Sequence, residues 1–382
     1  MIARDAAETL ISLAAGYPVV AVTGPRQSGK TTLVRAVFPG HAYTSLENPA
    51  QREFAESDPA GFLKTFDKGV ILDEVQRCPR LFEWLQGIVD EVREPGRFVL
   101  TGSQQFGLLS GITQSLAGRV ALLNLLPLAA SELRTASLLP SSLDEAVFHG
   151  GYPPLHDRHL DPGIWFANYV QTYIERDVRQ LLNVRDLSQF QRFLRLCAGR
   201  TGQLLNLSSL GEEAGVSHNT SREWISVLEA SFILHRLPPY HRNFNKRLVK
   251  TPKLYFHDTG LVVWLLGIES ARQLSTHPLR GPLFETWVVG EFLKRRLNTG
   301  RPSNLSFWRD RSGHEVDLLV ESPEGIQPVE IKATATPTAD ALRGLEQWRT
   351  MTGQPEPRPC LIYGGDTPQR RTDADVIPWR LL

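Results

Sequence analysis

The fold of the N-terminal part of this chain is decided by one stretch, Gly24-Pro25-Arg26-Gln27-Ser28-Gly29-Lys30-Thr31, which is followed by Thr32. The stretch matches the pattern G-x-x-x-x-G-K-[ST]. An apolar run at 18–22, typical of a buried strand, precedes it, and a helical pattern with apolar residues at 33–37 follows it. Because glycine-rich loops at a helix N-terminus present backbone N–H groups to phosphates, the sequence predicts that residues 24–32 bind a nucleotide.

Two side chains of this loop, and two that follow the next apolar run, predict the chemistry of the site. Lys30 would reach the β- and γ-phosphates, and the Thr31 hydroxyl would bind Mg²⁺. The apolar run at 70–72 ends in Asp73 and Glu74, at the carboxyl edge of the predicted sheet where ligands bind. We expect Asp73 to help hold Mg²⁺ and Glu74 to orient or deprotonate the attacking water, with ATP as the nucleotide.

A third apolar run, at 97–103, supplies candidates for a polar sensor of the γ-phosphate. It follows a helical pattern at 81–92 and ends in small polar residues. Thr101 and Ser103 would lie between the two carboxylates and the γ-phosphate. Further along the chain, Arg119 is a candidate phosphate contact, in cis or in trans from a second copy of the chain, against the ordinary alternative of a surface arginine. A trans role would require a homo-oligomer.

A turn signal at 150–153, with the sequence Gly-Gly-Tyr-Pro, marks the expected end of the nucleotide-binding part. Apolar residues at helical spacing then predict an amphipathic helix over 165–184. The segment 207–217 reads as a short helix and a glycine turn, with Ser217 as the N-cap of a second helix. This is a helix–turn–helix pattern, whose expected exposed residues are His218, Asn219, Ser221 and Arg222. A packing or dimerisation module is the equally weighted alternative to DNA binding.

Basic charge is concentrated after this helix pair. No acidic residue occurs between Glu229 and Asp258, and aromatic residues alternate there with six basic ones. Such a mixture is typical of nucleic-acid-binding surfaces, and two strands flanking a turn in this segment would form a wing. The candidate nucleic-acid contacts are Arg222, Arg242, Lys246 and Arg247. A solvated face, or a patch that meets another domain, is the alternative.

Acidic residues and a lysine are spaced along the predicted elements of the last part of the chain. An amphipathic helix from Pro282 to about Leu297, which carries Glu285, precedes strands expected at 305–310, 313–320 and 327–333. Asp317 lies on the second strand, and Glu330 and Lys332 face one side of the third because they are two residues apart. The carboxylates can bind one or two Mg²⁺ ions, and the lysine can stabilise charge at a scissile phosphate. The alternative is a domain that keeps these residues for folding or DNA contact without cleaving.

Length and composition limit the class of protein. The 382 residues suggest two or three domains, and 41% hydrophobic with 22% charged residues exclude a wholly disordered or coiled-coil chain. The three cysteines are scattered, which favours a reducing cytoplasm and Mg²⁺ rather than zinc. No apolar run approaches the ~18 residues that span a bilayer, so we expect no membrane partner. The net charge of +1 divides into 13 basic and 16 acidic residues at 1–150 and 14 and 11 at 151–270.

Taken together, these motifs resemble those of a bacterial and archaeal family of AAA-type ATPases with a C-terminal domain of unknown function that has restriction-endonuclease-like features. The matching segments follow the family order and cover nearly the whole chain, at 24–31, 72–76, 100–104, 116–119, 150–153, 255–261, 284–285, 315–317 and 329–332. The resemblance implies an α/β protein with three domains. These are a P-loop ATPase domain with a parallel sheet (1–150), a helical winged-helix-like domain (151–270) and an α/β restriction-endonuclease-like domain (271–382). It implies ATP binding and hydrolysis but no biological role.

Three functions are compatible with these residues. The first is a cytoplasmic Mg²⁺-dependent ATPase whose nucleotide cycle drives or gates DNA- or protein-directed action of the C-terminal half. The second is an ATP-regulated nuclease that uses Asp317, Glu330 and Lys332. The third is a non-catalytic nucleotide-dependent switch or DNA-binding module. ATP and ADP are the expected ligands, and DNA, a protein or a second copy of the chain are the candidate partners.

Overall fold

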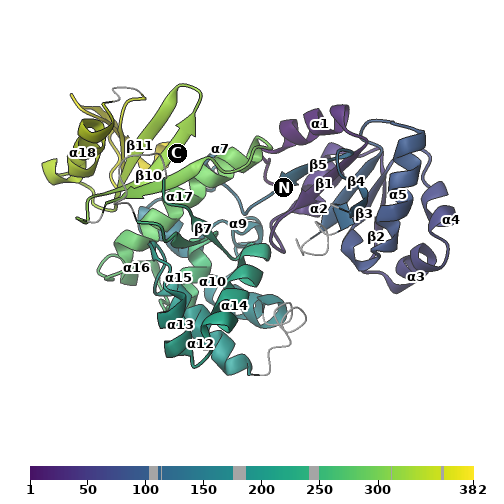
Figure 1. Cartoon of the computed structure of the whole chain (residues 1–382), viewed down its shortest axis with the longest axis horizontal. Helices are drawn as coiled ribbons and strands as arrows, with labels where there is room; N and C mark the ends of the chain where they lie inside the picture. Colours follow the sequence, from purple (N-terminus) through teal and green to yellow (C-terminus); the bar gives the residue numbers. More distant parts are fainter. Residues whose placement is uncertain (103–110, 113, 175–185, 241–248, 311, 354–356) are drawn as a thin grey trace. The chain divides into compact units, whose positions relative to one another are not determined.

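The computed structural model describes residues 1–102, 111–112, 114–174, 186–240, 249–310, 312–353 and 357–382 (Figure 1). These residues form two compact units. The first consists of Met1–Leu128 with the short segments Ala230–Phe232 and Lys294–Pro302, and the second of Ala129–Glu229, Ile233–Leu293 and Ser303–Leu382. The second unit thus includes most of both the middle and the C-terminal parts, and the domain boundaries near 150 and 270 stay predictions.

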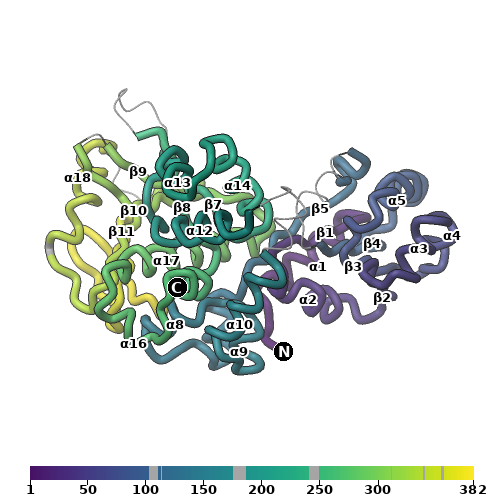
Figure 2. Tube along the Cα trace, turned by 90° about the horizontal axis from the view of Figure 1, so that it is seen from below, coloured from purple at the N-terminus to yellow at the C-terminus, as the bar shows by residue number. Residues whose placement is uncertain are grey.

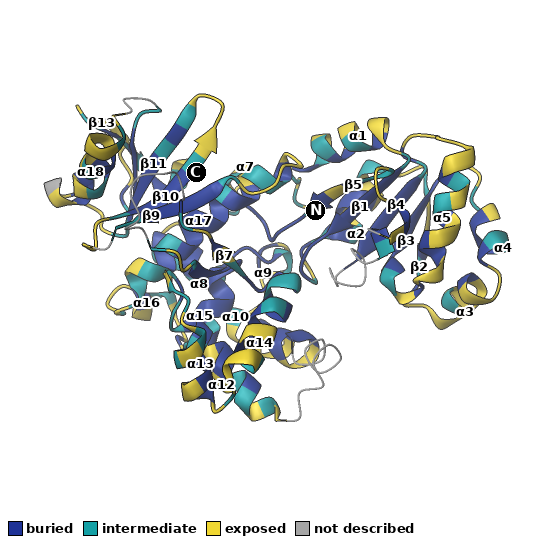
Figure 3. Ribbon diagram, viewed as in Figure 1, coloured by how far each residue is buried: buried dark blue, intermediate teal, exposed yellow. Residues whose placement is uncertain are grey.

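The first unit is built on a parallel sheet of five strands in the order β2-β3-β4-β1-β5. Its strands are β1 (Val19–Thr23), β2 (Ala42–Ser45), β3 (Val70–Asp73), β4 (Phe98–Gly102) and β5 (Val120–Asn124). Every residue of β1, β3 and β4 is buried, because both faces of these central strands are covered (Figure 3). The strands expected at 18–22 and 70–74 are therefore confirmed, and the strand expected at 97–103 is confirmed up to residue 102, beyond which the chain is not described.

Helices cover both faces of this sheet. On one face lie α1 (Ala7–Gly16) and α2 (Lys30–Val37), whose apolar residues join a buried cluster with alternate residues of β1. On the other face lie α3 (Pro49–Ser57), α4 (Pro59–Lys64) and α5 (Arg80–Glu91). In a fold with helices on both faces of a parallel sheet, ligands bind at the carboxyl ends of the strands. The helix predicted over 81–92 is confirmed as α5.

Short helices make up most of the first half of the second unit. They are α7 (Ala130–Thr135), α8 (Leu143–His149), α9 (Pro153–Asp157), α10 (Pro162–Tyr169), α12 (Leu187–Ala198), α15 (Thr259–Leu265) and α16 (Ala271–Leu274), with the helix–turn–helix pair treated below. The first part of the helix predicted over 165–184 is present as α10, which continues as a π-helical turn over Val170–Ile174. The remainder of that prediction lies outside the described residues.

The predicted pair of helices around a glycine turn is confirmed as α13 (Leu207–Ala214) and α14 (His218–Ala230). Gly215 ends α13 with a φ of 77°, in the left-handed region that favours glycine. The Ser217 hydroxyl accepts a hydrogen bond from the Thr220 N–H at 3.1 Å, as its predicted capping role requires. In both views α12 lies beside α13 (Figures 1 and 2).

A small antiparallel sheet follows this helix pair. It has the order β6-β8-β7, with β6 (Gln203–Leu204), β7 (Leu234–Leu237) and β8 (Lys253–Phe256). The turn expected to form a wing between β7 and β8 includes residues 241–248, which lie outside the described residues. The candidate nucleic-acid contacts Arg242, Lys246 and Arg247 are among them, so a winged helix stays a prediction.

The last part of the second unit is a mixed sheet of six strands in the order β13-β14-β12-β11-β10-β9. Its elements are α17 (Arg280–Asn298), β9 (Leu305–Arg309), β10 (Glu315–Ser322), β11 (Gly325–Lys332), η3 (Ala339–Leu342), α18 (Arg343–Thr352), β12 (Cys360–Tyr363), β13 (Gln369–Arg370), β14 (Asp375–Pro378) and η4 (Trp379–Leu381). Strands β9 to β11 are antiparallel, and β11, β12 and β14 are parallel. Leu345 and Trp348 of α18 pack on one face of this sheet. The helix and three strands predicted for 282–333 are confirmed.

Candidate functional site

The backbone of the 24–29 loop depends on its two glycines. The loop connects β1 to α2, which begins at Lys30. Gly24 has a φ of 148°, and a Cβ on it would lie 2.1 Å from the Leu125 carbonyl oxygen. Gly29 has a φ of 94° and immediately precedes α2. A side chain at Gly24 would therefore clash with backbone, and one at Gly29 would strain it.

The Lys30 ammonium lies inside this loop without a carboxylate in hydrogen-bond contact. Its Nζ donates to the carbonyl oxygens of Gly24 at 3.0 Å and Pro25 at 2.8 Å. Burial lowers the pKa of Lys30 to about 8, against the opposing effect of Glu74 and Asp73 nearby. The buried Ser28 Oγ has no hydrogen-bond partner among the described residues. A cation held only by carbonyls, beside an unsatisfied hydroxyl, fits the binding of an anionic phosphate.

The loop is held from its other side by Arg4. One guanidinium nitrogen of Arg4 donates to the Ser28 carbonyl at 2.6 Å and the other to the Leu126 carbonyl at 2.7 Å.

The remaining predicted residues of the nucleotide loop differ in their surroundings. Arg26 lies 3.9 Å from a Glu47 carboxylate oxygen, Gln27 has a φ of 61°, and Thr32 is exposed.

Three hydroxyl groups converge on the Asp73 carboxylate. Its Oδ1 accepts from Thr31 at 3.2 Å and from Thr101, and its Oδ2 accepts from Tyr43 at 2.8 Å. The parallel register explains the contact with Thr101, because this residue is the partner of Asp73 in the pairing of β3 with β4. Burial and the hydrogen bond to Asp73 raise the pKa of Tyr43 to about 12. Thr31 and Asp73 are the oxygen ligands that Mg²⁺ prefers, and the structure brings them together.

Glu74 lies just beyond the end of β3 in an unusual backbone conformation. Its φ of 56° is in the left-handed region, which costs a non-glycine residue roughly 1–3 kcal/mol. Gln76 Nε2 donates to its Oε2 at 2.5 Å. Backbone strain of this kind persists where the surrounding structure requires the conformation. Here it fixes the position of the Glu74 carboxylate, directly after Asp73.

The two other candidates of the nucleotide site have different outcomes. Thr101 contacts Asp73, whereas Ser103 lies outside the described residues. The Arg119 guanidinium makes a double contact with the Asp90 carboxylate of α5, at 2.6 and 2.8 Å. This hydrogen-bonded arginine holds the pKa of Asp90 below its usual range. Contact of Arg119 with a phosphate, in cis or in trans, stays a prediction.

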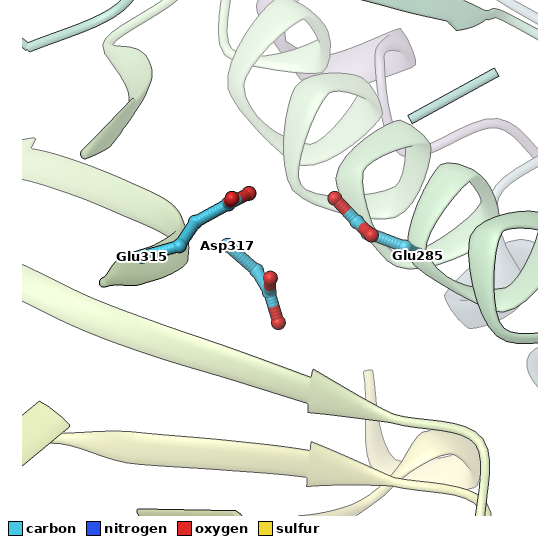
Figure 4. Close-up of side chains that lie close together, drawn as sticks. All are labelled: Glu285, Glu315 and Asp317. Carbon is cyan, nitrogen blue, oxygen red and sulfur yellow. The ribbon is translucent and has the colours of Figure 1, made fainter. Parts of the chain in front are cut away.

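The acidic set of the C-terminal part also converges. Oxygen atoms of Glu285 on α17 and of Glu315 and Asp317 on β10 all lie within 4.8 Å of one another (Figure 4). On β11, Lys332 Nζ lies 2.5 Å from a Glu330 oxygen and 3.6 Å from an Asp317 oxygen. The structure therefore brings together all four residues that the sequence predicts for this site.

Burial shapes the charges of this cluster. Desolvation and the neighbouring Asp317 carboxylate raise the pKa of Glu330 to about 8, although Lys332 opposes the shift. Desolvation, followed by Asp317, also raises the pKa of Glu285. Burial alone would lower the pKa of Lys332, but Asp317 and Glu330 together raise it. The cluster is a network of coupled charges rather than a set of solvated carboxylates.

The helix–turn–helix candidates present little basic charge. Arg222 is exposed on α14 and contacts the Asn219 side chain, while His218 is exposed beside it and Ser221 is buried. Glu223, also exposed, follows Arg222 directly. Of the four candidate nucleic-acid contacts, only Arg222 belongs to the described residues, so a nucleic-acid interface stays a prediction.

Comparison with known proteins identifies relatives over most of the chain. Residues 16–134 match the family described as AAA domain, and 140–272 and 280–382 match two domains of unknown function, DUF8612 and DUF4143. The uncharacterized protein Rv2008c of Mycobacterium tuberculosis is 34% identical over 339 residues, which are 88% of this chain and 75% of the relative. The uncharacterized protein Mb2031c of Mycobacterium bovis has the same identity and coverage. This chain belongs to the family of these two proteins, and its N-terminal part is an AAA domain.

Solved structures similar to this AAA-type ATPase have low sequence identity. The Walker-type ATPase PABY2304 of Pyrococcus abyssi is 13% identical, with a TM-score of 0.47, over 68% of this chain and 94% of that one. DnaA from Aquifex aeolicus, bound to AMPPCP, is 14% identical with a TM-score of 0.32, over 59% of this chain and 85% of that one. Within the described part of the chain, no helix has the length and apolarity needed to cross a membrane.

Four residues that contact the candidate sites of this AAA-type ATPase were missed by the sequence analysis. Tyr43 contacts Asp73, and Lys253, Tyr255 and Glu315 belong to the acidic cluster. Glu315 could have been found, since it lies two residues before Asp317 on one predicted strand and therefore faces the same side. Tyr43, Lys253 and Tyr255 come from strands whose partners no local pattern reveals.

Proposed function

We propose that this protein hydrolyses ATP with the help of Mg²⁺ at the carboxyl ends of β1, β3 and β4. The observation that carries the proposal is the arrangement around Asp73 and Lys30. The Asp73 carboxylate lies 3.2 Å from the Thr31 hydroxyl, and among the described residues the Lys30 ammonium donates hydrogen bonds to loop carbonyls alone. A metal ligand pair and an available cation thus lie at one loop, which is what a magnesium–nucleotide complex needs.

The residues of this site divide the work of hydrolysis. Lys30 binds the β- and γ-phosphates, and the N–H groups of the 24–29 loop bind the remaining phosphate oxygens. Thr31 and Asp73 hold Mg²⁺, which supplies positive charge to the phosphate oxygens. Thr101 fixes the orientation of the Asp73 carboxylate. Glu74 orients the attacking water and accepts its proton.

We further propose that the nucleotide cycle drives or gates the action of the C-terminal half on DNA or a protein. One helix, α17, supports this coupling. Its Lys294 donates to the Leu128 carbonyl at 2.9 Å within the first unit, and its Glu285 belongs to the acidic cluster of the second unit. A displacement of Leu128, which follows β5, would therefore act on α17, the helix that also carries Glu285.

Release of inorganic phosphate from ATP tests the proposed function directly. We expect release that requires Mg²⁺ and stops when EDTA removes the metal. Parallel reactions with single-stranded and double-stranded DNA test DNA as the partner, since stimulation by either form indicates DNA and unchanged rates remove DNA as an activator of turnover. Absence of Mg²⁺-dependent release in all of these reactions would leave the third function, a nucleotide-dependent switch.

Cleavage of nucleic acid by the acidic cluster is the second candidate function. It is favoured by the proximity of Lys332 to Asp317, at 3.6 Å, beside three converging carboxylates. If the cluster cleaves, Asp317→Ala will lower Mg²⁺-dependent nicking of a plasmid roughly 100-fold or more, because a metal ligand is lost. Asp340→Ala, at an exposed position of the same unit, is the matched control. Nicking that is unchanged in Asp317→Ala would remove this site as its source.

A further inference from the structure

A lysine of β8 lies among the carboxylates of the acidic cluster. Lys253 Nζ donates to a Glu285 oxygen at 2.8 Å and forms an ion pair with Glu315. Its side chain is only 4% exposed. It approaches the cluster over the ring of Phe307, with Nζ 5.4 Å from the ring centroid. The position of this ammonium is therefore fixed both by the Phe307 ring and by the carboxylates of Glu285 and Glu315.

This ammonium contacts two of the three carboxylates that could hold a metal ion. Glu285 and Glu315, which contact Lys253, are two of the three residues whose oxygens lie within 4.8 Å of one another. In Figure 4 the carboxylates of Glu285 and Glu315 point toward each other from α17 and β10. Tyr255, two residues further along β8, donates to the same Glu285 oxygen at 2.5 Å. Both β8 side chains thus satisfy a carboxylate that a metal ion would otherwise bind.

The balance of charge leaves little room for a second cation. Arg309 lies 3.3 Å from the other Glu315 oxygen, and Lys332 contacts Glu330 and Asp317. Among the described residues, three cations therefore face four carboxyl groups, namely those of Glu285, Glu315, Asp317 and Glu330. A divalent ion placed beside a buried ammonium would be repelled by it, and both Glu315 oxygens and one Glu285 oxygen already contact cations.

We infer that Glu285, Glu315 and Asp317 form a latent divalent-cation site whose cation position is held by the ammonium of Lys253. The site is composite, because β8 of the middle part supplies the cation and α17 and β10 supply the carboxylates. Metal binding requires Lys253 to leave. Any metal-dependent chemistry of this cluster would therefore be controlled by the position of β8.

Binding of Mn²⁺ in the absence of nucleotide tests this inference. All proteins carry Asp73→Asn, which removes the carboxylate of the other predicted metal site, so the result does not depend on ATP hydrolysis. Lys253→Met keeps an unbranched apolar stem against Phe307 and removes the charge. We expect weak Mn²⁺ binding to the parent and a gain of roughly tenfold or more in affinity for Lys253→Met, measured by calorimetry. Adding Asp317→Asn should abolish that gain.

A second lysine of the same cluster provides the matched control. Lys332→Met also removes one positive charge, but the Lys332 side chain is 39% exposed, and among the described residues its ammonium forms ion pairs with Glu330 and Asp317. A smaller gain for Lys332→Met than for Lys253→Met supports the assignment of the cation position to Lys253. Equal gains would show that only the net charge matters, and Mn²⁺ binding to the parent as tight as to Lys253→Met would overturn the inference.

A measurement on the native chain covers the case in which Lys253→Met does not fold. Reductive methylation followed by mass spectrometry reports which lysines are accessible. Lys253 should stay unmodified with and without millimolar Mn²⁺, whereas the exposed Lys64 is modified in both. If Mn²⁺ makes Lys253 reactive, the ion reaches the carboxylates in the native protein, and the inference that Lys253 keeps metal out of this site is overturned.

Discussion

Replacing Lys30 by alanine is expected to abolish ATP turnover, with a loss of roughly 100-fold or more in the rate of phosphate release. The ammonium lies inside the loop that would bind the phosphates, and its hydrogen bonds go only to the Gly24 and Pro25 carbonyls. Without the ammonium, the partial negative charge of the Gly24 and Pro25 carbonyl oxygens would repel the phosphates. Nucleotide binding is therefore expected to weaken together with turnover, which titration with a fluorescent ATP analogue would measure.

The fold of the Lys30→Ala protein should survive. Burial lowers the pKa of Lys30 to about 8, so its charge is held in the folded state at a cost that the substitution removes. Thermal unfolding without nucleotide checks this expectation. Lys64→Ala, at an exposed position of α4, is the control for removal of a lysine from the same unit. Turnover by Lys30→Ala at the rate of Lys64→Ala would refute the assigned role of Lys30.

The nucleotide loop was predictable because its determinants are local. Gly24 and Gly29 are required by backbone angles within the loop, and Lys30 and Thr31 follow it directly. The contact of Thr31 with Asp73 was also predictable, since parallel strands place their carboxyl ends at one edge of the sheet.

Contacts that depend on strand pairing were not predictable in this way. Tyr43 reaches Asp73 because β2 pairs with β3. Lys253 of β8 reaches Glu285 of α17, which lies 32 residues further along the chain. The acid-free segment that includes Lys253 suggested a nucleic-acid surface, yet this lysine is buried in an ion-pair network. Charge along a sequence therefore does not say whether a basic side chain faces solvent or neutralises an acid.

Replacing Glu74 by glutamine is expected to block hydrolysis while nucleotide binding is retained. The amide has nearly the shape of the carboxylate and can still accept the hydrogen bond from Gln76. The backbone at this residue, with its φ of 56°, should therefore keep its conformation. The amide cannot accept a proton from the attacking water, and loss of a general base lowers the rate by roughly 100-fold to 10,000-fold.

Two measurements separate this base role from a role in binding or positioning. Equilibrium titration of ATP should give affinities for Glu74→Gln and the native protein that differ little, and single-turnover phosphate release should show the whole loss in the chemical step. Glu83→Gln, on the exposed face of α5, is the control for loss of a carboxylate near the same sheet. Lys30, Thr31 and Asp73 are unchanged in Glu74→Gln. A weakened affinity for ATP in this variant would therefore indicate that Glu74 supports the metal site rather than accepting a proton. Equal hydrolysis rates in Glu74→Gln and Glu83→Gln would remove it from the reaction altogether, and the base would have to be sought among the other polar groups around Asp73.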